Sequence, residues 1–584
     1  MTAGRAWILF AALAAGCGGQ SPGPRASAGG APPASTARPP AAAPRPPVVV
    51  ALVVDQLAAW QAIERWPTLP ASGGFAKLIR ESGASAILRY PYAHNATAMG
   101  HSSLFTGAVP HDSGIVANGK LAGQGQYLSF FSDDATKVVT GGGVAERAGS
   151  SLRALLVPTV ADALREAHPD ALVMAFSMKD RGALFGGGKQ PDAVLWFDAK
   201  ADAFVTSTAF ATSTPAWASA FTEIGAGARY RTKPWSPLDP RWLEARHLEG
   251  GDLGQGDFHH LGATFPHDLE KADPAPKAFI ATPFADAMLL DLATRAADEA
   301  AKMNRPTLLA VSLSSTDYVG HVFGPDAPEA WDQMLRLDAL LGRFLDHLDA
   351  TFGKDGYAVV LSSDHGVPPT PEVMKARFCG QTTADPFERR CTTPVRLFEN
   401  ELGKTAQAAA ERAAGKGSWV LGGNEPYVEL SQAARDLPPK KRDALIDAVA
   451  KALDDLPGVL RVYPALRVPE VCPPLADESL DALVCRSVRR GASGDFFLVM
   501  EQGSFIDTNY VEGDGVNHGT HWLFDRTVPI VSRPARAPAK GRSGALDTGR
   551  TVDHRAYAAT LAALLGVDPP AAARGGAVLG LAER

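Results

Sequence analysis

The sequence predicts an α/β protein: a mainly parallel central sheet sandwiched by helices, with a small α+β insertion that caps it. Two observations lead to this fold class. Short apolar runs rich in β-branched residues alternate with helical patterns along the chain. Acidic and imidazole side chains also stand directly after several of these runs, and open α/β sheets place their sites at the carboxyl ends of strands.

Six runs have the length and composition of buried strands. They are residues 47–54, 171–176, 193–197, 307–313, 357–361 and 528–531. Between the fourth and the fifth run, apolar residues recur at helical spacing over residues 331–348, which predicts a helix with one face buried against the sheet.

We predict that residues 48–370 and 505–584 form the main domain and that residues 371–504 form the insertion. The connection between His365 and His518, roughly 150 residues, is far longer than ordinary loops. It contains strand-like runs at 427–430, 459–463 and 495–500 and a helical pattern at 440–453. A stretch rich in aromatic residues and glycine, about 199–276, is expected to be a second insertion.

The amino terminus resembles an export signal. Arg5 precedes an apolar stretch over residues 6–15 that is too short to span a bilayer, and Leu13-Ala14-Ala15-Gly16-Cys17 resembles a bacterial lipobox. Residues 1–17 are therefore expected to be a signal peptide, with lipid attached to Cys17; ordinary cleavage nearby is the alternative. Residues 18–47, mainly Pro, Ala, Gly and Ser, are expected to be a disordered tether. The protein is then periplasmic or on the outer surface, anchored to a bacterial membrane.

The remaining four cysteines suit an oxidising compartment. They are Cys379, Cys391, Cys472 and Cys485. Local pairing, Cys379 with Cys391 and Cys472 with Cys485, is the simplest of three possible connectivities. The absence of Cys-x-x-Cys spacing makes a metal role for these thiols the weaker hypothesis.

Composition excludes some classes of function. A net charge of -6 offers no basic stripe for nucleic acid. No run after the amino terminus has the length and apolarity of a membrane span, and no internal repeat indicates a solenoid.

Three predicted strand ends carry side chains of the kinds that bind zinc, namely carboxylates and imidazoles. The six candidate ligands are Asp55, Asp317, His321, Asp364, His365 and His518. Such ligands alone do not identify a reaction, because the nucleophile must be found as well.

The segment 97–118 supplies that candidate. It reads Thr97-x-x-Gly-His-Ser-Ser, then Phe-Thr-Gly, then Gly-Ile-Val-x-Asn118. This pattern resembles the nucleophile region of the alkaline phosphatase superfamily, and most of all the threonine-nucleophile, phosphate-insensitive (PafA-like) alkaline phosphatases and the related nucleotide pyrophosphatase/phosphodiesterases. The matching blocks follow the family's order from Asp55 to His518, so the resemblance covers most of the chain after the tether.

The resemblance implies a site with two Zn²⁺ ions. Asp55, Thr97, Asp364 and His365 would surround one ion, and Asp317, His321 and His518 would hold the other. Thr97 would be bound as an alkoxide and phosphorylated during turnover, while Asn118 would donate to a phosphate oxygen. Two metals suit phosphoryl transfer, because they stabilise both the attacking and the leaving oxygen.

Lys179 and Arg181 discriminate between branches of the superfamily. They follow the strand-like run 171–176 and resemble the Lys-x-Arg pair of the monoesterase branch. A monoester dianion has an extra charged oxygen, which an ammonium group and a guanidinium group can bind. The pair favours small-molecule phosphate monoesters as substrates.

Each assignment has a simpler alternative. Lys179 and Arg181 can form a solvated turn, Thr97 can be an ordinary N-cap, and Asn118 can serve a turn beside Gly119. His101, four residues after Thr97, is expected to pack or hydrogen-bond near the site rather than bind metal. His521 is the rival of His518.

Other histidines have no expected part in the metal site. His259, His260 and His267 are expected on the surface or in loops, whereas His94 and His111 flank the nucleophile segment without an assigned role.

The resulting hypothesis is an exported alkaline phosphatase that hydrolyses phosphate monoesters through a phosphothreonine at Thr97. A phosphodiesterase or nucleotide pyrophosphatase of the same superfamily is the first alternative, and a non-catalytic surface-binding lipoprotein is the second. Sulfatase is disfavoured, because no Cys-x-Pro-x-Arg sequence stands at the nucleophile position.

Overall fold

The computed structural model describes residues 47–246, 253–381, 383–508, 511, 513–535 and 545–580. These residues all lie in one compact unit, Arg45–Arg584. The expected signal peptide with Cys17, and the tether up to residue 46, lie outside the described residues. Among the described residues, no helix combines the length and apolarity needed to cross a membrane.

The centre of the main sheet is parallel, as predicted. Its strands lie in the order β11 (Ala358–Ser362), β1 (Val48–Val54), β10 (Thr307–Leu313), β7 (Leu172–Ser177) and β8 (Ala193–Asp198). Each is almost fully buried, which explains why these strands are continuous apolar runs. The register pairs Val54 with Leu313 and Val53 with Ser362, so β1, β10 and β11 end at the same edge.

The flanks of this eleven-stranded sheet are mixed rather than parallel. On one side β18 (Thr527–Arg533), the sixth predicted strand, runs antiparallel to β11 and to β2 (Ala84–Arg89), and β19 (Thr551–Asp553) follows. On the other side are β9 (Ala203–Ser207), β5 (Ser132–Thr140) and β6 (Gly143–Ser150), all antiparallel. Polar residues interrupt β5 and β6. These two strands therefore lack the apolar runs from which the central strands were predicted.

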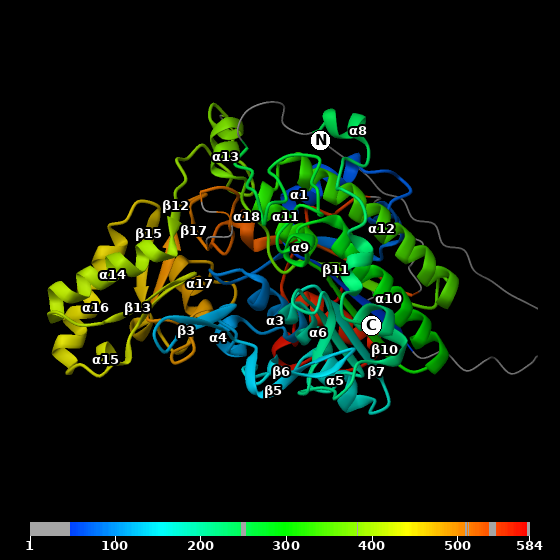
Figure 1. Ribbon diagram of the computed structural model, residues 1–584, viewed down its shortest axis with the longest axis horizontal. Coiled ribbons are helices and arrows are strands. Elements are labelled where there is room, and N and C mark those ends of the chain that lie inside the picture. Colours follow the sequence, from blue (N-terminus) through cyan, green and yellow to red (C-terminus); the bar gives the residue numbers. More distant parts are fainter. Residues whose placement is uncertain are drawn as a thin grey trace, which may run out of the picture. The chain divides into compact units, whose positions relative to one another are not determined.

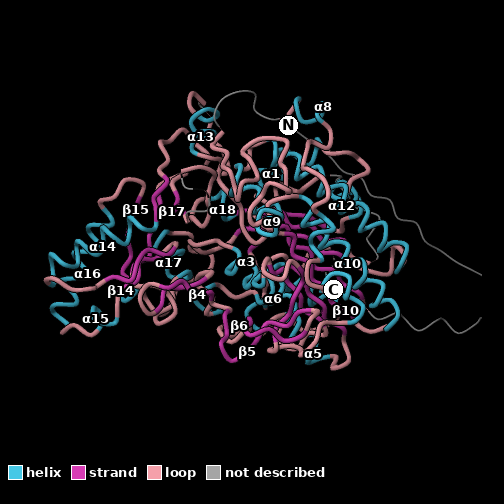
Figure 2. The backbone as a smooth tube through the Cα atoms, viewed as in Figure 1, coloured by secondary structure: helices cyan, strands magenta, loops and turns pink. Residues whose placement is uncertain are grey.

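Helices cover both faces of the sheet (Figures 1 and 2). On one face α6 (Asp180–Gly187) lies so close that a Cβ at Gly186 would be 2.5 Å from the Cβ of Ala310. The neighbouring residues of β10 point to the opposite face, where α10 (Pro283–Met303) packs. Helix α12 (Pro328–Phe352), predicted over 331–348, packs against α10 and α2 (Gly74–Glu81).

Three further helices complete the layer on the α6 side. They are α3 (Thr97–Thr106), α5 (Val160–Ala167) and α19 (Arg555–Leu565). Helix α3 contacts α6 and α19, and the Phe105 and Tyr557 rings meet edge to face at 5.6 Å. These contacts hold α3 against its neighbours in this layer.

The insertion contains its own antiparallel sheet, in the order β13 (Val420–Asn424), β14 (Tyr427–Leu430), β16 (Phe496–Met500) and β15 (Val459–Pro464). Helices α14 (Glu399–Ala414) and α16 (Pro439–Asp454) pack on each other and share an apolar core with the sheet. These elements include all four predicted from the sequence; α14 was not predicted. A hairpin of β3 (Gly119–Ala122) and β4 (Gln126–Ser129) contacts β13.

The structure contains the two disulfides of the simplest connectivity, Cys379–Cys391 and Cys472–Cys485. They close loops of 12 and 13 residues. In the chain-entropy model, loops of this size stabilise a fold by about 3 kcal/mol each.

The segment rich in aromatic residues packs on α11 (Ser315–Phe323) and on the start of α12. Trp235 packs edge to face on Phe323 and donates from Nε1 to Asp332 Oδ2 at 2.7 Å. His267 lies in a loop, as expected, where it forms an isolated bridge with Trp235, but its side chain is fully buried rather than on the surface. Its Nε2 lies 3.2 Å from Glu329 Oε1, and this polar partner makes its burial tolerable.

Candidate active site

Three buried carboxylates meet at the shared edge of the central strands. Asp55 directly follows β1, Asp364 follows β11 by one residue, and Asp317 lies in the first turn of α11 after β10. The Asp55 amide continues the strand ladder by donating to Leu313 O at 2.9 Å. The sheet register therefore brings together side chains that are far apart in sequence.

Three histidines complete this cluster. His321 follows Asp317 by one helical turn, and its Nε2 lies 3.2 Å from Asp317 Oδ1. His365 Nε2 lies 3.3 Å from Asp55 Oδ1, and His518 Nε2 lies 3.5 Å from Asp317 Oδ1. The His365 and His518 rings stack with centroids 3.7 Å apart. All six predicted ligands thus lie in one place.

The donor set fits metal ions. Asp317, His321 and His518 form one group of ligand atoms, and Asp55, Asp317 and His365 form another, each within 4.8 Å. Asp317 therefore belongs to both groups, whereas the sequence placed it in one. Asp364 Oδ2 lies 3.5 Å from His365 Nε2, beside the second group.

Buried polar atoms in this cluster also indicate that the site suits metal ions. Asp55 Oδ1, Asp364 Oδ2 and His365 Nε2 are buried, and none makes a hydrogen bond of good geometry within the described part of the chain. Imidazole nitrogens do approach both carboxylate oxygens, with His365 Nε2 3.3 Å from Asp55 Oδ1 and His101 Nδ1 3.0 Å from Asp364 Oδ2. Such atoms are costly unless something binds them. Carboxylate oxygen and imidazole nitrogen are the donor types that zinc takes.

Thr97 begins helix α3, but it is not the N-cap. Ala96 holds the N-cap position, so the Thr97 hydroxyl is not engaged as a cap. Thr97 Oγ1 instead accepts a hydrogen bond from Lys179 Nζ at 3.2 Å. The hydroxyl thus faces the carboxylate cluster, at the positive end of the helix dipole, where a phosphate is favoured.

Lys179 is buried at the centre of the site. It is the N-cap residue of α6, and its ammonium group donates to Asp55 Oδ2 at 2.6 Å and to Asp317 Oδ2 at 2.5 Å. Burial opposes its charge, but Asp317 and Asp55 outweigh burial and raise its pKa. A solvated turn is therefore the wrong interpretation for Lys179.

Arg181 and Asn118 lie near Lys179 and line the same cavity as Thr97. Asn118 Oδ1 accepts from the Ala98 amide at 3.1 Å, which fixes the side chain against the first turn of α3. The amide NH₂ of Asn118 is then left to face away from that turn.

Burial and neighbouring charges shift the pKa values of the cluster. Burial, followed by Asp317 and Asp364, raises the pKa of Asp55. Burial opposes protonation of His365, but Asp364 and Asp55 raise its pKa to about 9. Burial and the adjacent His365 lower the pKa of His518 to about 3. These shifts describe the side chains alone, and a bound cation would favour the ionised carboxylates and neutral imidazoles.

The sequence analysis missed Gln56, which connects both parts of the cluster. Its Nε2 donates to Asp317 Oδ1 at 2.9 Å, and its backbone amide donates to Asp364 Oδ1 at 3.2 Å. Its backbone is in the left-handed region, with φ 63°. A Cβ at Gly320 would lie 1.8 Å from Gln56 Oε1, so the glycine leaves the room that the Gln56 side chain needs in this position. A lone Gln after Asp55 gives no sequence signal of this geometry.

The remaining histidines stay outside the ligand groups of the described residues. His101 is buried near the site, with Nε2 2.7 Å from Ser312 Oγ and Nδ1 2.9 Å from Thr97 O, as the packing hypothesis required. His521 stacks beside Trp522 and does not join the groups. His94 contacts Gly519 O at 3.0 Å.

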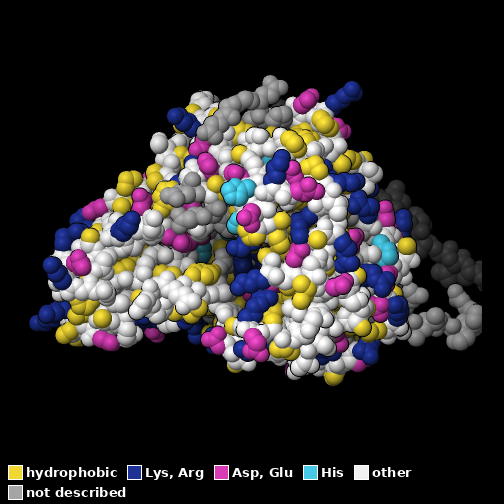
Figure 3. Space-filling view, in the orientation of Figure 1, with side chains coloured by type: hydrophobic (Ala, Val, Ile, Leu, Met, Phe, Trp, Pro, Cys, Tyr) yellow, Lys and Arg dark blue, Asp and Glu magenta, His cyan; other side chains and the backbone are white. Residues whose placement is uncertain are grey.

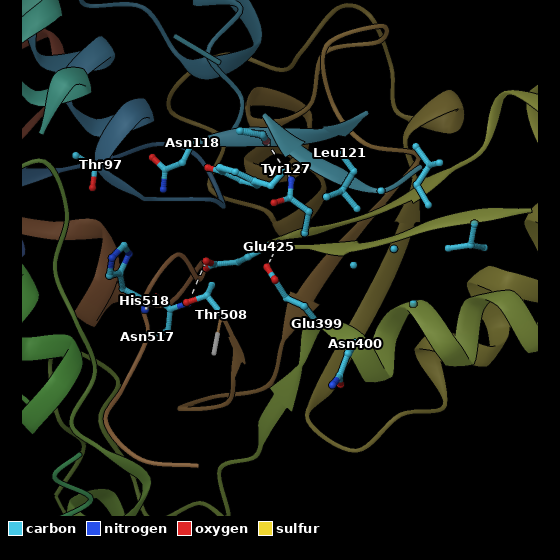
Figure 4. Close-up of a pocket in the computed structure, with 18 of the residues that line it drawn as sticks. Thr97, Asn118, Leu121, Tyr127, Glu399, Asn400, Glu425, Thr508, Asn517 and His518 are labelled. Atoms are coloured by element: carbon cyan, nitrogen blue, oxygen red, sulfur yellow. Dashed lines mark hydrogen bonds between the residues drawn. The ribbon is translucent and has the colours of Figure 1, made fainter. Parts of the chain in front are cut away.

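A cavity of about 850 Å³ opens above the cluster. One end is lined by Thr97, Asn118, Lys179, Arg181 and His518, and the other by the α14 and β13 parts of the insertion. Figure 4 shows Thr97, Asn118 and His518 on one side of this space and Glu399 and Asn400 on the other. On the face seen in Figure 3, Lys and Arg side chains gather centrally below a group of His side chains.

The family follows from a comparison of the whole chain. Residues 49–521 match the type I phosphodiesterase / nucleotide pyrophosphatase family model. The chain belongs to this family. Its members' chemistry makes the protein a phosphoesterase that acts on phosphate esters, and the cluster and cavity are a candidate phosphoesterase site.

Relatives within the family have several names. The chain is 29% identical to a calcium-transporting ATPase of Myroides odoratus over 83% of this chain and 86% of the relative. It is also 29% identical to the alkaline phosphatase PafA of Elizabethkingia meningoseptica, again over 83% and 86%. The crystal structure of wild-type PafA superimposes with a TM-score of 0.77 and 26% identity, over 92% of this chain and 99% of PafA.

Proposed function

We propose that this phosphoesterase is an alkaline phosphatase that hydrolyses small-molecule phosphate monoesters through a phosphothreonine at Thr97. The observation that carries the proposal is the placement of Lys179 and Arg181 in one cavity with Thr97 and Asn118. The terminal phosphate of a monoester has one more charged oxygen than a diester. Two cationic side chains beside the nucleophile favour that dianion.

A variant of PafA supports the same four roles. Its crystal structure, with a TM-score of 0.75 and 26% identity to this chain, carries replacements of a threonine, an asparagine, a lysine and an arginine. The lysine and the arginine are separated by one residue, as Lys179 and Arg181 are. The threonine and the asparagine are as far apart in sequence as Thr97 and Asn118.

We further propose that the cluster holds two Zn²⁺ ions. Asp317, His321 and His518 would hold one, and Asp55, Thr97, Asp364 and His365 the other. When bound, zinc lowers the pKa of a hydroxyl and stabilises charge on the attacking and leaving oxygens.

The side chains of the protein perform the remaining steps. Thr97 Oγ1 attacks phosphorus, the bond to the organic group breaks, and the alcohol leaves with a proton. Lys179, Arg181 and Asn118 bind the phosphate oxygens throughout, and the start of α3 directs its amides and dipole toward them. Water then cleaves the phosphothreonine, which releases phosphate and restores the Thr97 hydroxyl.

Export and anchoring belong to the same proposal. The lipobox-like sequence around Cys17 supports a lipid-anchored protein on the periplasmic or outer side of a bacterial membrane. The two disulfides suit that oxidising location. Phosphate esters outside the cytoplasm would then be the substrates.

A phosphodiesterase is the second candidate, because the matched family is described by diester and pyrophosphate substrates. The deciding experiment compares kcat/KM of the zinc-loaded protein for an aryl phosphate monoester and for its matched methyl diester at one alkaline pH. A strong monoester preference supports the alkaline phosphatase. A preference for the diester would support the second candidate, a phosphodiesterase with the same site. No turnover of either ester would favour a non-catalytic binding lipoprotein.

Gln56 offers a test of how the metal ligands are held. Gln56→Met keeps the side-chain length but removes the hydrogen bond to Asp317, so we expect zinc affinity to fall by about 10- to 100-fold. The measurement is zinc binding in competition with a chelator, with the d–d absorption of the cobalt-loaded protein as a readout independent of turnover.

The control for Gln56 separates the side chain from the strained backbone. Gln56→Gly removes the same hydrogen bond but relieves the positive φ. Both variants should lose zinc affinity if the hydrogen bond matters. Wild-type affinity in Gln56→Met would show that the contact with Asp317 is dispensable.

A further inference from the structure

The cavity continues beyond the phosphate-binding side chains to the insertion. Lys179 and Arg181 line the end near Thr97, whereas Glu399 and Glu425 line the part formed by the insertion. The organic group of a phosphate ester must lie in the part of the cavity that the phosphate does not fill. This part therefore decides which organic groups are accepted.

Glu425 is fixed beside the proposed metal ligand His518. Its Oε2 accepts from Asn517 Nδ2 at 3.0 Å, and Asn517 is adjacent to His518 in the chain. A Cβ at Gly519 would lie 2.7 Å from Glu425 Oε1. Both oxygens of this carboxyl group thus lie against the 517–519 segment, and Figure 4 shows Glu425 beside Asn517 and His518.

Glu399 supports Glu425 and adds a second carboxyl group. Its Oε1 accepts from the Glu425 amide at 2.9 Å. Lys404 also lines this part of the cavity, but it is exposed to solvent. Two carboxyl groups in one part of the cavity favour a cationic group there.

Tyr127 provides an aromatic wall. It stands on β4 of the hairpin that follows Asn118, lines the same cavity, and is 53% exposed, so part of its ring is accessible to a ligand in that cavity. Figure 4 shows its ring close to Glu425. The face of a tyrosine ring attracts cations.

We propose that Glu399, Glu425 and Tyr127 form a leaving-group subsite that prefers phosphate monoesters whose organic group ends in an ammonium group. The inference rests on the proposed function, because it places the phosphate at Thr97. The substrate class is then a zwitterion, with its anionic end at Lys179 and Arg181 and its cationic end at the insertion.

The test uses two inhibitors that differ in one group. 3-Aminopropylphosphonate and butylphosphonate have the same length, but one ends in an ammonium group and the other in a methyl group. Because their P–C bonds replace the scissile P–O bond, their inhibition constants are free of differences in leaving-group reactivity. We expect the wild-type protein to bind the aminopropyl compound about 10-fold more tightly.

Glu425→Gln should reduce this preference to less than about twofold, since the amide keeps the shape but loses the charge. Glu399→Gln is a second variant that decides the question should Glu425→Gln fail to fold. Glu401→Gln changes an exposed residue of α14 outside the cavity and should keep the wild-type ratio.

Turnover of an aryl monoester in the same assays separates the two proposals. Equal binding of both inhibitors by a wild-type protein that turns over the monoester overturns the subsite and leaves the proposed function intact. The subsite is overturned in the same way when the preference persists in the Glu425→Gln or Glu399→Gln variant. A wild-type protein without turnover overturns both proposals.

Discussion

Thr97→Ala is expected to abolish the phosphoenzyme and to lower kcat/KM for an aryl phosphate monoester by at least about ten thousandfold. The alanine variant has no oxygen at the start of α3, where Thr97 Oγ1 lies 3.2 Å from Lys179 Nζ. Zinc content should remain near the wild-type value, because the carboxylates and imidazoles of the cluster are unchanged. Acid quenching during turnover of a radiolabelled monoester measures the phosphoenzyme directly.

The matched control is Thr97→Ser, which keeps a hydroxyl at the same position. This variant should form a phosphoenzyme and retain a substantial part of the activity. Turnover near the wild-type value by the zinc-loaded Thr97→Ala variant would contradict the assignment of Thr97 as the nucleophile. Loss of zinc together with activity would instead show that Thr97 acts mainly as a ligand.

The strands at the centre of the main sheet could be predicted from the sequence because each of them is an apolar run. The strands β1, β7, β8, β10 and β11 are buried on both faces, so each is mainly a run of apolar residues with few polar positions. The outer strands β5 and β6 are partly exposed and polar, and they gave no such signal. Burial on both faces thus helped to make the central strands predictable, but it was not sufficient, because the buried strand β9 contains Thr and Ser and was not predicted.

The candidate ligands could be predicted because they stand at strand ends, which the sheet register brings to one edge. The group of Asp317, His321 and His518 is the one predicted. The share of Asp317 in the second group was not predicted, because it depends on where its carboxylate lies in three dimensions. The role of Gln56 could not be predicted from the sequence either, because it depends on a left-handed backbone and on the close approach of Gly320. These are features of three-dimensional packing rather than of sequence spacing.

Lys179 shows how the structure altered the interpretation of a motif. In the sequence, a phosphate-binding role was the preferred interpretation of Lys-x-Arg, and a solvated turn was the alternative. In the structure the ammonium group is buried between Asp55 and Asp317, which excludes that alternative. A buried cation requires such partners, and their loss would leave two carboxylates facing each other.

Replacing both Lys179 and Arg181 by alanine is expected to reduce kcat/KM for monoesters by about a thousandfold and for diesters by less than about tenfold. Each side chain provides a charge-assisted hydrogen bond of about 1.5–3 kcal/mol, and two of them account for a loss of this size. A diester covers one of the oxygens that these groups bind. The two kcat/KM values, measured at one pH on matched aryl esters, give the ratio directly.

Lys179 also contacts the carboxylate cluster. The double variant therefore needs controls that separate recognition of the phosphate charge from metal binding. Arg181→Ala alone removes the guanidinium group without breaking the contacts of Lys179 with Asp55 and Asp317, and it should still cost monoesters more than diesters. Lys189→Ala removes an exposed cation just after α6 and should change neither value. Equal losses for both ester types, with zinc retained, would mean that the pair does not recognise the dianion, and the family's diesterase chemistry would then describe this site better.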